Sequence, residues 1–306
     1  METMLLSRAI KLFLGDQKPS TARSYKYVLD YMEEYTHVFG LYHVHEIRPD
    51  HLIEMIQLVV QRPTVKSTAT VNKYIKTIKV FFNWCLKLGF IQPPSPATAI
   101  KRKKEPMAVS RQKAMPDATY LQLVDCVKWD VRAYALVLFL GDSGDRIGGA
   151  AHLRWSDVDL TKRSALVTEK GQDPRFVYFR PECCLALTRW RTEQAAKPDA
   201  FVFSKDGGAI SNDALGQYFT RWCHKSGIGN WGPHSLRHRL GYQMADKRIA
   251  PSTAAMVLGH VNVTTTLKNY YPRDWERAQQ VVDELGFDPA KKPENPKIIE
   301  DNFGTG

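Results

Sequence analysis

The chain has 306 residues, of which 43% are hydrophobic and 25% charged, a composition typical of a soluble globular protein with room for two domains. Its longest apolar run, residues 134–140, is far too short to cross a bilayer, and residues 1–16 lack the cleavage site of a signal peptide, so we expect a cytoplasmic protein with no membrane partner. The net charge of +11 is uneven, because residues 1–113 hold 18 Lys and Arg against 9 Asp and Glu. A basic first third favours a polyanion, above all nucleic acid, as the partner.

Amphipathic helical patterns fill the first hundred residues. Helices are predicted over residues 1–16, 20–34, 49–61 and 68–88, the last of which is ended by Gly89. Lysines recur along one stripe of this last helix, at Lys73, Lys76 and Lys79. The stripe is either a solvated face or a row that faces DNA phosphates, and both interpretations remain open. Residues 1–98 are predicted to form a small all-helical domain.

A proline-rich segment, residues 92–96, leads out of this domain into the basic run Lys101, Arg102, Lys103 and Lys104. Prolines exclude regular structure over the whole of residues 92–113. We interpret residues 99–113 as a basic linker that is free to run along a DNA backbone and that joins the helical domain to a second one.

The pattern changes from residue 114 onwards, where helices and short strands are both predicted. Helical patterns cover residues 116–130, 132–144, 212–227, 232–247 and 251–260. Residues 163–181 alternate like two short strands around a Gly-Gln-Asp-Pro turn, and residues 201–203 are predicted as a further strand. The sequence therefore predicts a second domain over residues 114–286, mainly α with a small β-sheet, and a loose polar tail over residues 287–306.

Residues 231–239, WGPHSLRHR, place several cationic or titratable groups directly after a Gly-Pro break. Pro233 suits the first position of a helix, which puts His234 and Arg237 on one face of its first turns. The helix dipole favours an anion there, and an arginine offers it a rigid bidentate donor. Packed cores rarely hold such a group, so we interpret the pair as a phosphate site, with a surface charge cluster as the alternative.

Two further stretches, residues 141–160 and 254–274, carry polar groups next to glycine-rich breaks, and a lysine lies in the turn between the two strands predicted over residues 163–181. Together with the phosphate site they give, in chain order, Arg146, Lys170, His234, Arg237, His260 and the pair Tyr270 and Tyr271. Arginines can hold the non-bridging oxygens of a phosphodiester, and a lysine can protonate a departing oxygen. A tyrosine can attack phosphorus when positive charge or a base assists it, and His234 is the candidate for that assistance.

The ordered set of DRIGGAAHLRWSDVD, EKG, HSLRH, LGH and a downstream tyrosine resembles the tyrosine recombinases, also called the phage integrase family, over nearly the whole chain. The resemblance implies a two-domain clamp that grips duplex DNA in a C shape, with a core-binding domain followed by a catalytic domain. It implies roles for the residues just ordered: Arg146 and Arg237 as catalytic arginines, Lys170 as the hairpin lysine, His234 and His260 as active-site histidines, and Tyr270 or Tyr271 as the nucleophile. No metal, ATP or other cofactor is expected, because a covalent phosphotyrosine stores the energy of the broken bond.

Two departures from the family pattern bear on these roles. The tyrosine commonly lies nine residues after the histidine of LGH, where this chain has Asn269, so Tyr270 is favoured over Tyr271 while the choice stays open. Many relatives also carry an acidic residue three positions after the first arginine, where this chain has Gly149. We expect an adjusted set of supporting contacts there and an active enzyme.

Other polar and aromatic residues have simpler interpretations. His238 is expected to serve packing or backbone support, and Arg154 and Arg175 are expected on a solvated surface. Trp155 and Trp190 are expected in the core. Metal-ligand spacing is missing from the scattered histidines and from the five cysteines, which are His43, His45 and His51, and Cys85, Cys126, Cys183, Cys184 and Cys223.

The sequence thus predicts site-specific recombination, with DNA cleavage through a 3′-phosphotyrosine, strand exchange through a Holliday junction, and rejoining. The resemblance implies a homo-tetramer on two DNA sites, with residues 276–287 as a helix that docks on a neighbouring subunit or on its own domain. Among compact recombinases we prefer a mobile-element or phage integrase over a Xer-type resolvase or an integron-like enzyme. The alternatives from other classes are a DNA-binding relative that has lost cleavage and a type IB topoisomerase-like enzyme that relaxes DNA as a monomer.

Overall fold

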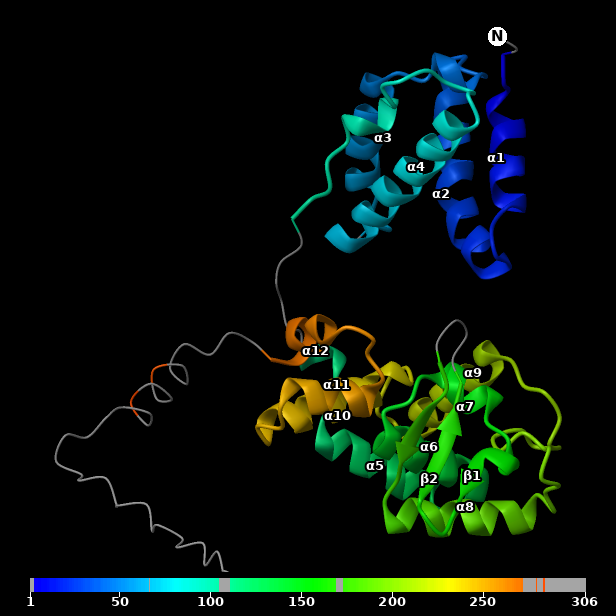
Figure 1. The fold of residues 1–306 in the computed structure, drawn as a ribbon, viewed down its shortest axis with the longest axis vertical. Coiled ribbons are helices and arrows are strands. Elements are labelled where there is room, and N and C mark those ends of the chain that lie inside the picture. Colours follow the sequence, from blue (N-terminus) through cyan, green and yellow to red (C-terminus); the bar gives the residue numbers. More distant parts are fainter. Residues whose placement is uncertain are drawn as a thin grey trace, which may run out of the picture. The chain divides into compact units, whose positions relative to one another are not determined.

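A computed structural model describes residues 3–65, 67–104, 111–168 and 173–271, together with Gln279 and Asp283. The chain divides into two compact units, Met1–Met107 and Ala108–Gly306 (Figure 1). The limits given above for the domains, the linker and the tail remain predictions. The helix predicted over residues 276–287 lies almost entirely outside the described residues, and the tail lies wholly outside them. Within the described ranges, no helix is both long enough and apolar enough to cross a membrane.

The first unit is a bundle of helices. Its helices, including two short 3₁₀ helices, are α1 (Leu6–Gly15), α2 (Pro19–Val38), η1 (Val44–Glu46), α3 (Pro49–Gln61), α4 (Thr68–Lys87) and η2 (Pro96–Thr98). Their starts follow from the sequence, because α2 and α3 begin with proline and Ser67 Oγ accepts the backbone N–H of Thr70 at 3.2 Å to cap α4. The predicted helices are confirmed, although α2 continues to Val38 instead of ending at residue 34.

The basic run is held against α4 at Lys103. Asn72 is buried on α4, donates through Nδ2 to the backbone oxygen of Lys103 at 2.9 Å, and accepts the Lys103 backbone N–H at 2.8 Å. A side-chain amide that satisfies both backbone groups of one residue fixes that residue in place. The expectation that the linker is free is therefore wrong at Lys103, while the side chains of residues 101–104 are all exposed.

The second unit is mainly helical with a small sheet. In chain order it contains η3 (Arg111–Lys113), α5 (Asp117–Val127), α6 (Val131–Ser143), α7 (Ile147–His152), η4 (Trp155–Asp157), β1 (Val158–Asp159), β2 (Ser164–Val167), β3 (Arg175–Tyr178), α8 (Pro181–Glu193), α9 (Asn212–Lys225), α10 (His234–Asp246), α11 (Pro251–Leu258) and α12 (Val263–Tyr270). The helices predicted in this unit are confirmed, and the elements that were not predicted include α8, α12 and β1. Figure 1 shows α10, α11 and α12 gathered on one side of the unit and the strands with α8 on the other.

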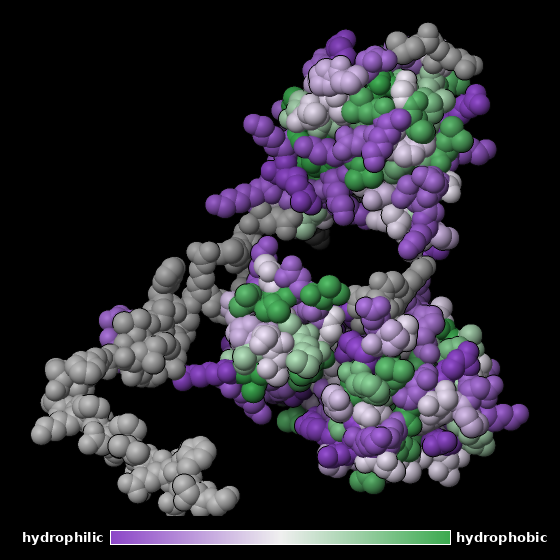
Figure 2. Space-filling model, in the orientation of Figure 1, coloured by the Kyte–Doolittle hydropathy of each residue, from purple (hydrophilic) through white to green (hydrophobic). Residues whose placement is uncertain are grey.

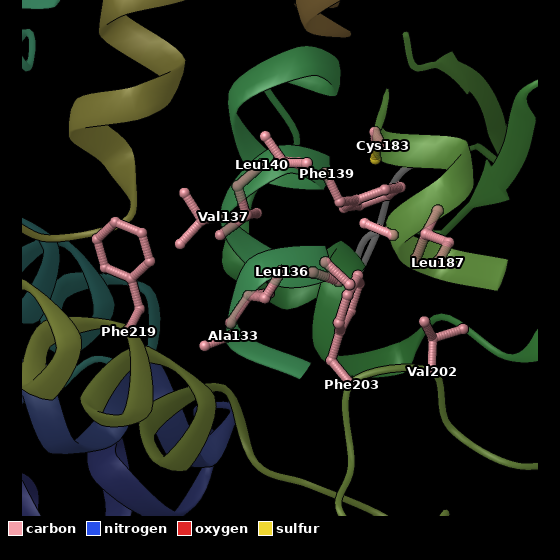
Figure 3. Packing of buried hydrophobic residues seen from close by; sticks show 14 of the residues in the cluster. Ala133, Leu136, Val137, Phe139, Leu140, Cys183, Leu187, Val202, Phe203 and Phe219 are labelled. Carbon is pink, nitrogen blue, oxygen red and sulfur yellow. The ribbon is translucent and has the colours of Figure 1, made fainter. Parts of the chain in front are cut away.

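The core of this unit is built around α6. Almost every residue of α6 is buried, so the helix is hydrophobic on all sides, as a central helix must be. Figure 3 shows side chains of α6 packed against Cys183 and Leu187 of α8, Phe219 of α9, and Phe203. Trp155 and Trp190 are 2% and 4% exposed, which confirms that they belong to the core. This packing fixes the end of α6, from which the chain enters the candidate site.

The strands are antiparallel and, in the described residues, form a three-stranded sheet in the order β1-β2-β3. Ser164 pairs with Tyr178 and Val167 with Arg175, so the two strands predicted over residues 163–181 are confirmed. Residues 201–203 are not a strand, because only Phe201 makes an isolated bridge and the chain then turns. With two residues, β1 is too short for alternation to reveal it.

Candidate active site

Arg146 follows the sharp turn that ends α6. Gly144 is left-handed there, at φ +59°, and a Cβ on it would lie 2.7 Å from Leu240 Cδ2 on α10. Glycine therefore serves both the backbone conformation and the close approach of the two helices. Arg146 is the residue that precedes α7 and is half-buried, which agrees with the break predicted from the sequence.

Arg237 is buried in the first turn of α10. Its side chain is 4% exposed, and Nη1 donates to the backbone oxygen of Gly144 at 2.8 Å. This bond ties Arg237 to the turn that leads into Arg146, so the two arginines belong to one site. His234 is exposed at the first residue of α10, and Pro233 lies one position before the helix and not inside it as predicted.

His260 lies just beyond α11, which ends at the left-handed Gly259 with φ +63°. Its Nδ1 is 2.7 Å from the Oγ1 of Thr266, a fully buried residue of α12. The His260 ring stacks on Tyr270, with centroids 6.3 Å apart and ring planes 7° apart. These contacts fix the orientation of the imidazole and bring it to the candidate nucleophile.

The two candidate tyrosines have different surroundings. Tyr270, the last residue of α12, is 2% exposed and its ring lies over Gly241 of α10, where a Cβ would approach the ring to 2.6 Å. Tyr271 is less buried, and its hydroxyl donates to the backbone oxygen of Ile249 at 2.6 Å. Because the Tyr271 hydroxyl is engaged by a backbone carbonyl, the geometry favours Tyr270.

The Tyr270 hydroxyl contacts a histidine that sequence reasoning assigned to packing. His238 Nδ1 on α10 lies 3.2 Å from the Tyr270 oxygen. Burial lowers the pKa of His238 from its ordinary 6.5, and the positive charges of His234, Lys113 and Arg237 lower it further. The neutral imidazole therefore prevails at neutral pH and can accept a proton. The sequence held a signal, because positions 234 and 238 share one face of a helix.

Opposing effects act on the pKa of Tyr270. Burial is the largest and raises it above the ordinary 10.0, while the positive charges of Arg237 and Arg146 lower it. A phenol that senses both guanidinium groups lies in their electric field. The structure thus brings a buried tyrosine together with two arginines and two histidines, a set suited to attack on a phosphodiester.

Two further expectations concern the hairpin. Lys170 lies outside the described residues, so its place in the site stays a prediction. Arg175, expected on a solvated surface, is 16% exposed, and its Nη2 donates to the buried Asp145 Oδ1 at 2.7 Å. That expectation was wrong because the partner carboxylate lies 30 residues away in the sequence. Arg154 is exposed as expected, with its guanidinium carbon 4.1 Å from the centroid of the Phe201 ring.

The basic residues predicted to contact DNA lie on α4 and on the segment that follows the last helix of the first unit. Lys73 and Lys76 are exposed on α4 and Lys79 is half-buried. Because Asn72 binds the backbone of Lys103, the basic run of residues 101–104 passes beside the start of this stripe. Figure 2 shows long hydrophilic side chains projecting from the visible face of this unit.

The described part of the chain holds no group of three or more His, Cys, Asp or Glu side chains that could bind a metal ion. His43 instead lies 3.3 Å from Glu46 Oε1, and the same carboxylate accepts the backbone N–H groups of Tyr42 and His43. Cys85, Cys183 and Cys223 are buried as core thiols.

The chain is similar to known proteins in sequence and in fold. Residues 113–277 match the profile described as "Phage integrase family". "Tyrosine recombinase XerC" of Xanthomonas axonopodis pv. citri (strain 306) is 28% identical over 220 residues, which cover 71% of this chain and 72% of that protein. The solved structure of the Tn1549 transposon integrase in complex with a circular intermediate DNA matches with a TM-score of 0.73 at 17% identity, over 93% of this chain and 100% of that chain. A lambda integrase tetramer bound to a Holliday junction matches with a TM-score of 0.69 at 16% identity, over 90% of this chain and 80% of that one.

Proposed function

Because the chain belongs to the phage integrase family and is a tyrosine-type site-specific recombinase, we propose that it cleaves and rejoins duplex DNA through a 3′-phosphotyrosine on Tyr270. The observation that carries the proposal is the buried Tyr270 hydroxyl, 3.2 Å from His238 Nδ1 and in the field of Arg146 and Arg237. A neutral phenol is a poor nucleophile, and these neighbours supply the base and the positive charge that it needs.

The side chains of this site can account for every bond change and proton transfer of the reaction. The Tyr270 oxygen bonds to phosphorus as the bond from phosphorus to the 5′ oxygen breaks. The phenol proton passes to His238, which takes the role expected of His234 because its Nδ1 contacts the Tyr270 hydroxyl. Arg146 and Arg237 hold the non-bridging oxygens, on which negative charge grows, while Lys170 delivers a proton to the departing 5′ oxygen. A 5′ hydroxyl of another strand then attacks the phosphotyrosine, so the broken bond is restored without ATP.

His260 and His234 complete the binding of the phosphate in this proposal. His260 is oriented by Thr266 and by the stack on Tyr270, and we assign its imidazole to a phosphate oxygen. His234, exposed in the first turn of α10, stands where the helix dipole favours an anion. Removing either histidine should weaken phosphate binding without removing the nucleophile.

We assign the grip on DNA to the basic surface of the first unit together with the catalytic unit, which close on the duplex as a clamp. In this arrangement residues 1–98 are the core-binding domain, residues 99–113 the linker and residues 114–286 the catalytic domain. Lys73, Lys76, Lys79 and residues 101–104 face the phosphates. The contact depends on charge and not on base sequence.

Replacing Lys101, Arg102, Lys103 and Lys104 by alanine is expected to weaken DNA binding across sequences. Each lost phosphate contact should lower the slope of log affinity against log salt by about 0.9. Fluorescence anisotropy over a range of salt concentrations measures this slope. The control replaces Arg8 and Lys11, exposed on α1, and should leave the slope unchanged. Asn72→Ala keeps every charge and releases the linker, so it should lower affinity with a smaller change of slope. An unchanged slope in the fourfold variant would place the linker away from DNA.

The rate of adduct formation should depend on pH through His238. Since the pKa of His238 lies below 6.5, the rate should be flat near neutral pH and fall as the pH drops through that pKa, where protonated His238 can no longer accept the phenol proton. His238→Asn should slow the reaction by about 10²–10⁴-fold and remove this acid limb. Single-turnover rates across pH measure both effects, with the exposed His224→Asn as control. An acid limb that persists in His238→Asn would assign the proton to another group.

The second unit carries an exposed apolar patch suited to contact between subunits. Met256 and Val261 are 76% and 92% exposed, and Val263 and Leu267 on α12 are also exposed. Figure 2 shows hydrophobic residues at the surface over α12. We assign this patch to a neighbouring copy in a homo-tetramer on two DNA sites, with residues 276–287 as the docking segment. A lambda integrase tetramer on a Holliday junction has a similar fold, which supports this assignment.

The experiment that tests the function uses a nicked suicide duplex from DNA that flanks the gene. Covalent attachment of the protein to labelled DNA is expected, and transfer of strands between two sites is expected on intact duplexes. Specific DNA binding without an adduct would favour the non-cleaving relative. Relaxation of supercoils with no strand transfer would favour the topoisomerase-like alternative. Sequenced junctions then separate mobile-element integration, our preference, from Xer-type resolution, which the identity to XerC favours.

A further inference from the structure

The residue before Arg146 is a buried carboxylate with a cationic partner. Asp145 has a fully buried side chain, and its Oδ1 accepts a hydrogen bond from Arg175 Nη2 at 2.7 Å. Arg175 is the first residue of β3 and is 16% exposed. A buried ion pair adds little net stability over an apolar pair of the same shape, so its presence at this point suggests a positional role.

Gly149 makes room for this carboxylate. A Cβ built on Gly149 would overlap Oδ2 of Asp145 and lie 2.8 Å from its Cγ. The carboxylate of Asp145 therefore occupies the space in which a side chain at position 149 would begin. The two positions exclude each other, because one volume can hold an acid from residue 145 or from residue 149 but not from both.

A second glycine makes room for the partner. A Cβ on Gly259 would overlap Nε of Arg175 and lie 2.8 Å from its Cζ. Gly259 directly precedes His260, and Arg175 Nη1 also reaches the backbone oxygen of Val257 at 3.3 Å. The guanidinium thus lies between the end of α11 and the turn that carries Arg146.

We infer that Asp145 supplies, from the residue before Arg146, the carboxylate that many relatives carry three residues after it, and that Asp145 and Arg175 form a positioning pair for the site. The pair joins three segments, namely the Arg146 turn, the first residue of β3 and the chain that enters His260. Neither member touches the reacting atoms. The pair fixes the positions of Arg146 and His260 relative to β3. The catalytic part of this inference rests on the proposed function. The inference that Asp145 occupies the space of an acid at position 149 does not depend on that function.

The test moves the carboxylate between the two positions. Asp145→Ala is expected to lower the rate of adduct formation at saturating DNA by about 10²-fold with little change in DNA affinity, because a small displacement of a catalytic group has effects of that size. Gly149→Asp alone should be at least as impaired, since two carboxylates cannot share the space. The double variant with Asp145→Ala and Gly149→Asp should recover most of the lost rate, and Gly149→Glu in the same background tests a longer reach.

Two controls separate positioning from general stability. Asp142→Ala breaks another pair of a buried Asp with an Arg in the same unit, that of Asp142 with Arg180, and should lower the unfolding temperature without lowering the rate at saturating DNA. Asp145→Asn keeps the shape but not the charge, and should fall between wild type and Asp145→Ala.

The outcomes distinguish this inference from the proposed function. If the wild type forms adduct and the double variant reacts no faster than Asp145→Ala, the inference fails and the function stands. If the wild type forms no adduct, the proposed function is wrong. The unfolding temperature alone then tests whether acids at positions 145 and 149 occupy the same space. Recovery of that temperature in the double variant, relative to both single variants, would support the shared position, and no recovery would overturn it.

Discussion

Replacing Tyr270 by phenylalanine is expected to abolish the covalent adduct on a nicked suicide substrate while leaving duplex binding nearly intact. The substitution removes the attacking oxygen but keeps the ring, which packs over Gly241 and edge-on to Tyr242 at a centroid distance of 5.3 Å. The loss of the contact with His238 should lower the free energy of unfolding by only about 1 kcal/mol. Denaturing gels of labelled DNA and gel shifts measure the two effects.

Tyr271→Phe is the matched control for this result. Its hydroxyl donates to the backbone oxygen of Ile249, so its removal should destabilise the protein by about 1 kcal/mol and leave adduct formation in place. An adduct in Tyr270→Phe that is missing in Tyr271→Phe would move the nucleophile by one residue. An adduct in both variants would mean that neither tyrosine is the nucleophile.

The burial of Tyr270 explains why its neighbours matter. Since burial raises the pKa of Tyr270, the phenol stays protonated at neutral pH, and the charges of Arg237 and Arg146 only partly oppose this effect. Attack therefore needs an acceptor for the proton. His238 is suited to that role because burial and the positive charges of His234, Lys113 and Arg237 hold its own pKa low. One environment thus keeps the nucleophile neutral and its base unprotonated.

Much of this site could be predicted because its residues lie at the ends of helices, where local signals are strong. Gly144 before Arg146 and Gly259 before His260 mark helix ends by their left-handed backbone, and Pro233 marks the start of α10. Each of these signals involves only a few adjacent residues. The sequence therefore predicted which segments carry the candidate groups, and periodicity predicted α6, α10 and α11 but not α12, which ends in Tyr270.

Contacts between distant segments could not be predicted in the same way. His238 and Tyr270 are 32 residues apart, and Asp145 and Arg175 are 30 apart, so neither pairing leaves a local pattern. Gly149 was visible only as a missing acid, and the reason for it is a side chain four residues earlier in the chain. The strand expected over residues 201–203 was wrong for a related reason, because Val202 and Phe203 fill the core beside α6 instead of joining the sheet.

Lys170→Ala is expected to cleave a normal phosphodiester about 10²–10⁴-fold more slowly than the wild type, the range of a lost general acid. The prediction rests on the place of Lys170 in the sequence between β2 and β3, a few residues before Arg175, the first residue of β3, which contacts Asp145. A general acid matters most when the leaving group is a poor one. When the substrate carries sulfur at the bridging 5′ position, the leaving group departs as a thiolate and needs no proton. Lys170→Ala should therefore cleave this substrate at nearly the wild-type rate.

Arginine variants give the contrast that identifies the acid. Arg146→Ala and Arg237→Ala should not be rescued by the bridging sulfur, because their role is to stabilise charge on the non-bridging oxygens, which the substitution leaves unchanged. Lys162→Ala, at an exposed lysine that precedes β2, controls for a general loss of positive charge. Equal losses on both substrates for Lys170→Ala would show that this lysine binds phosphate and delivers no proton. Rescue of either arginine variant would assign the acid to that arginine or to a group that it positions.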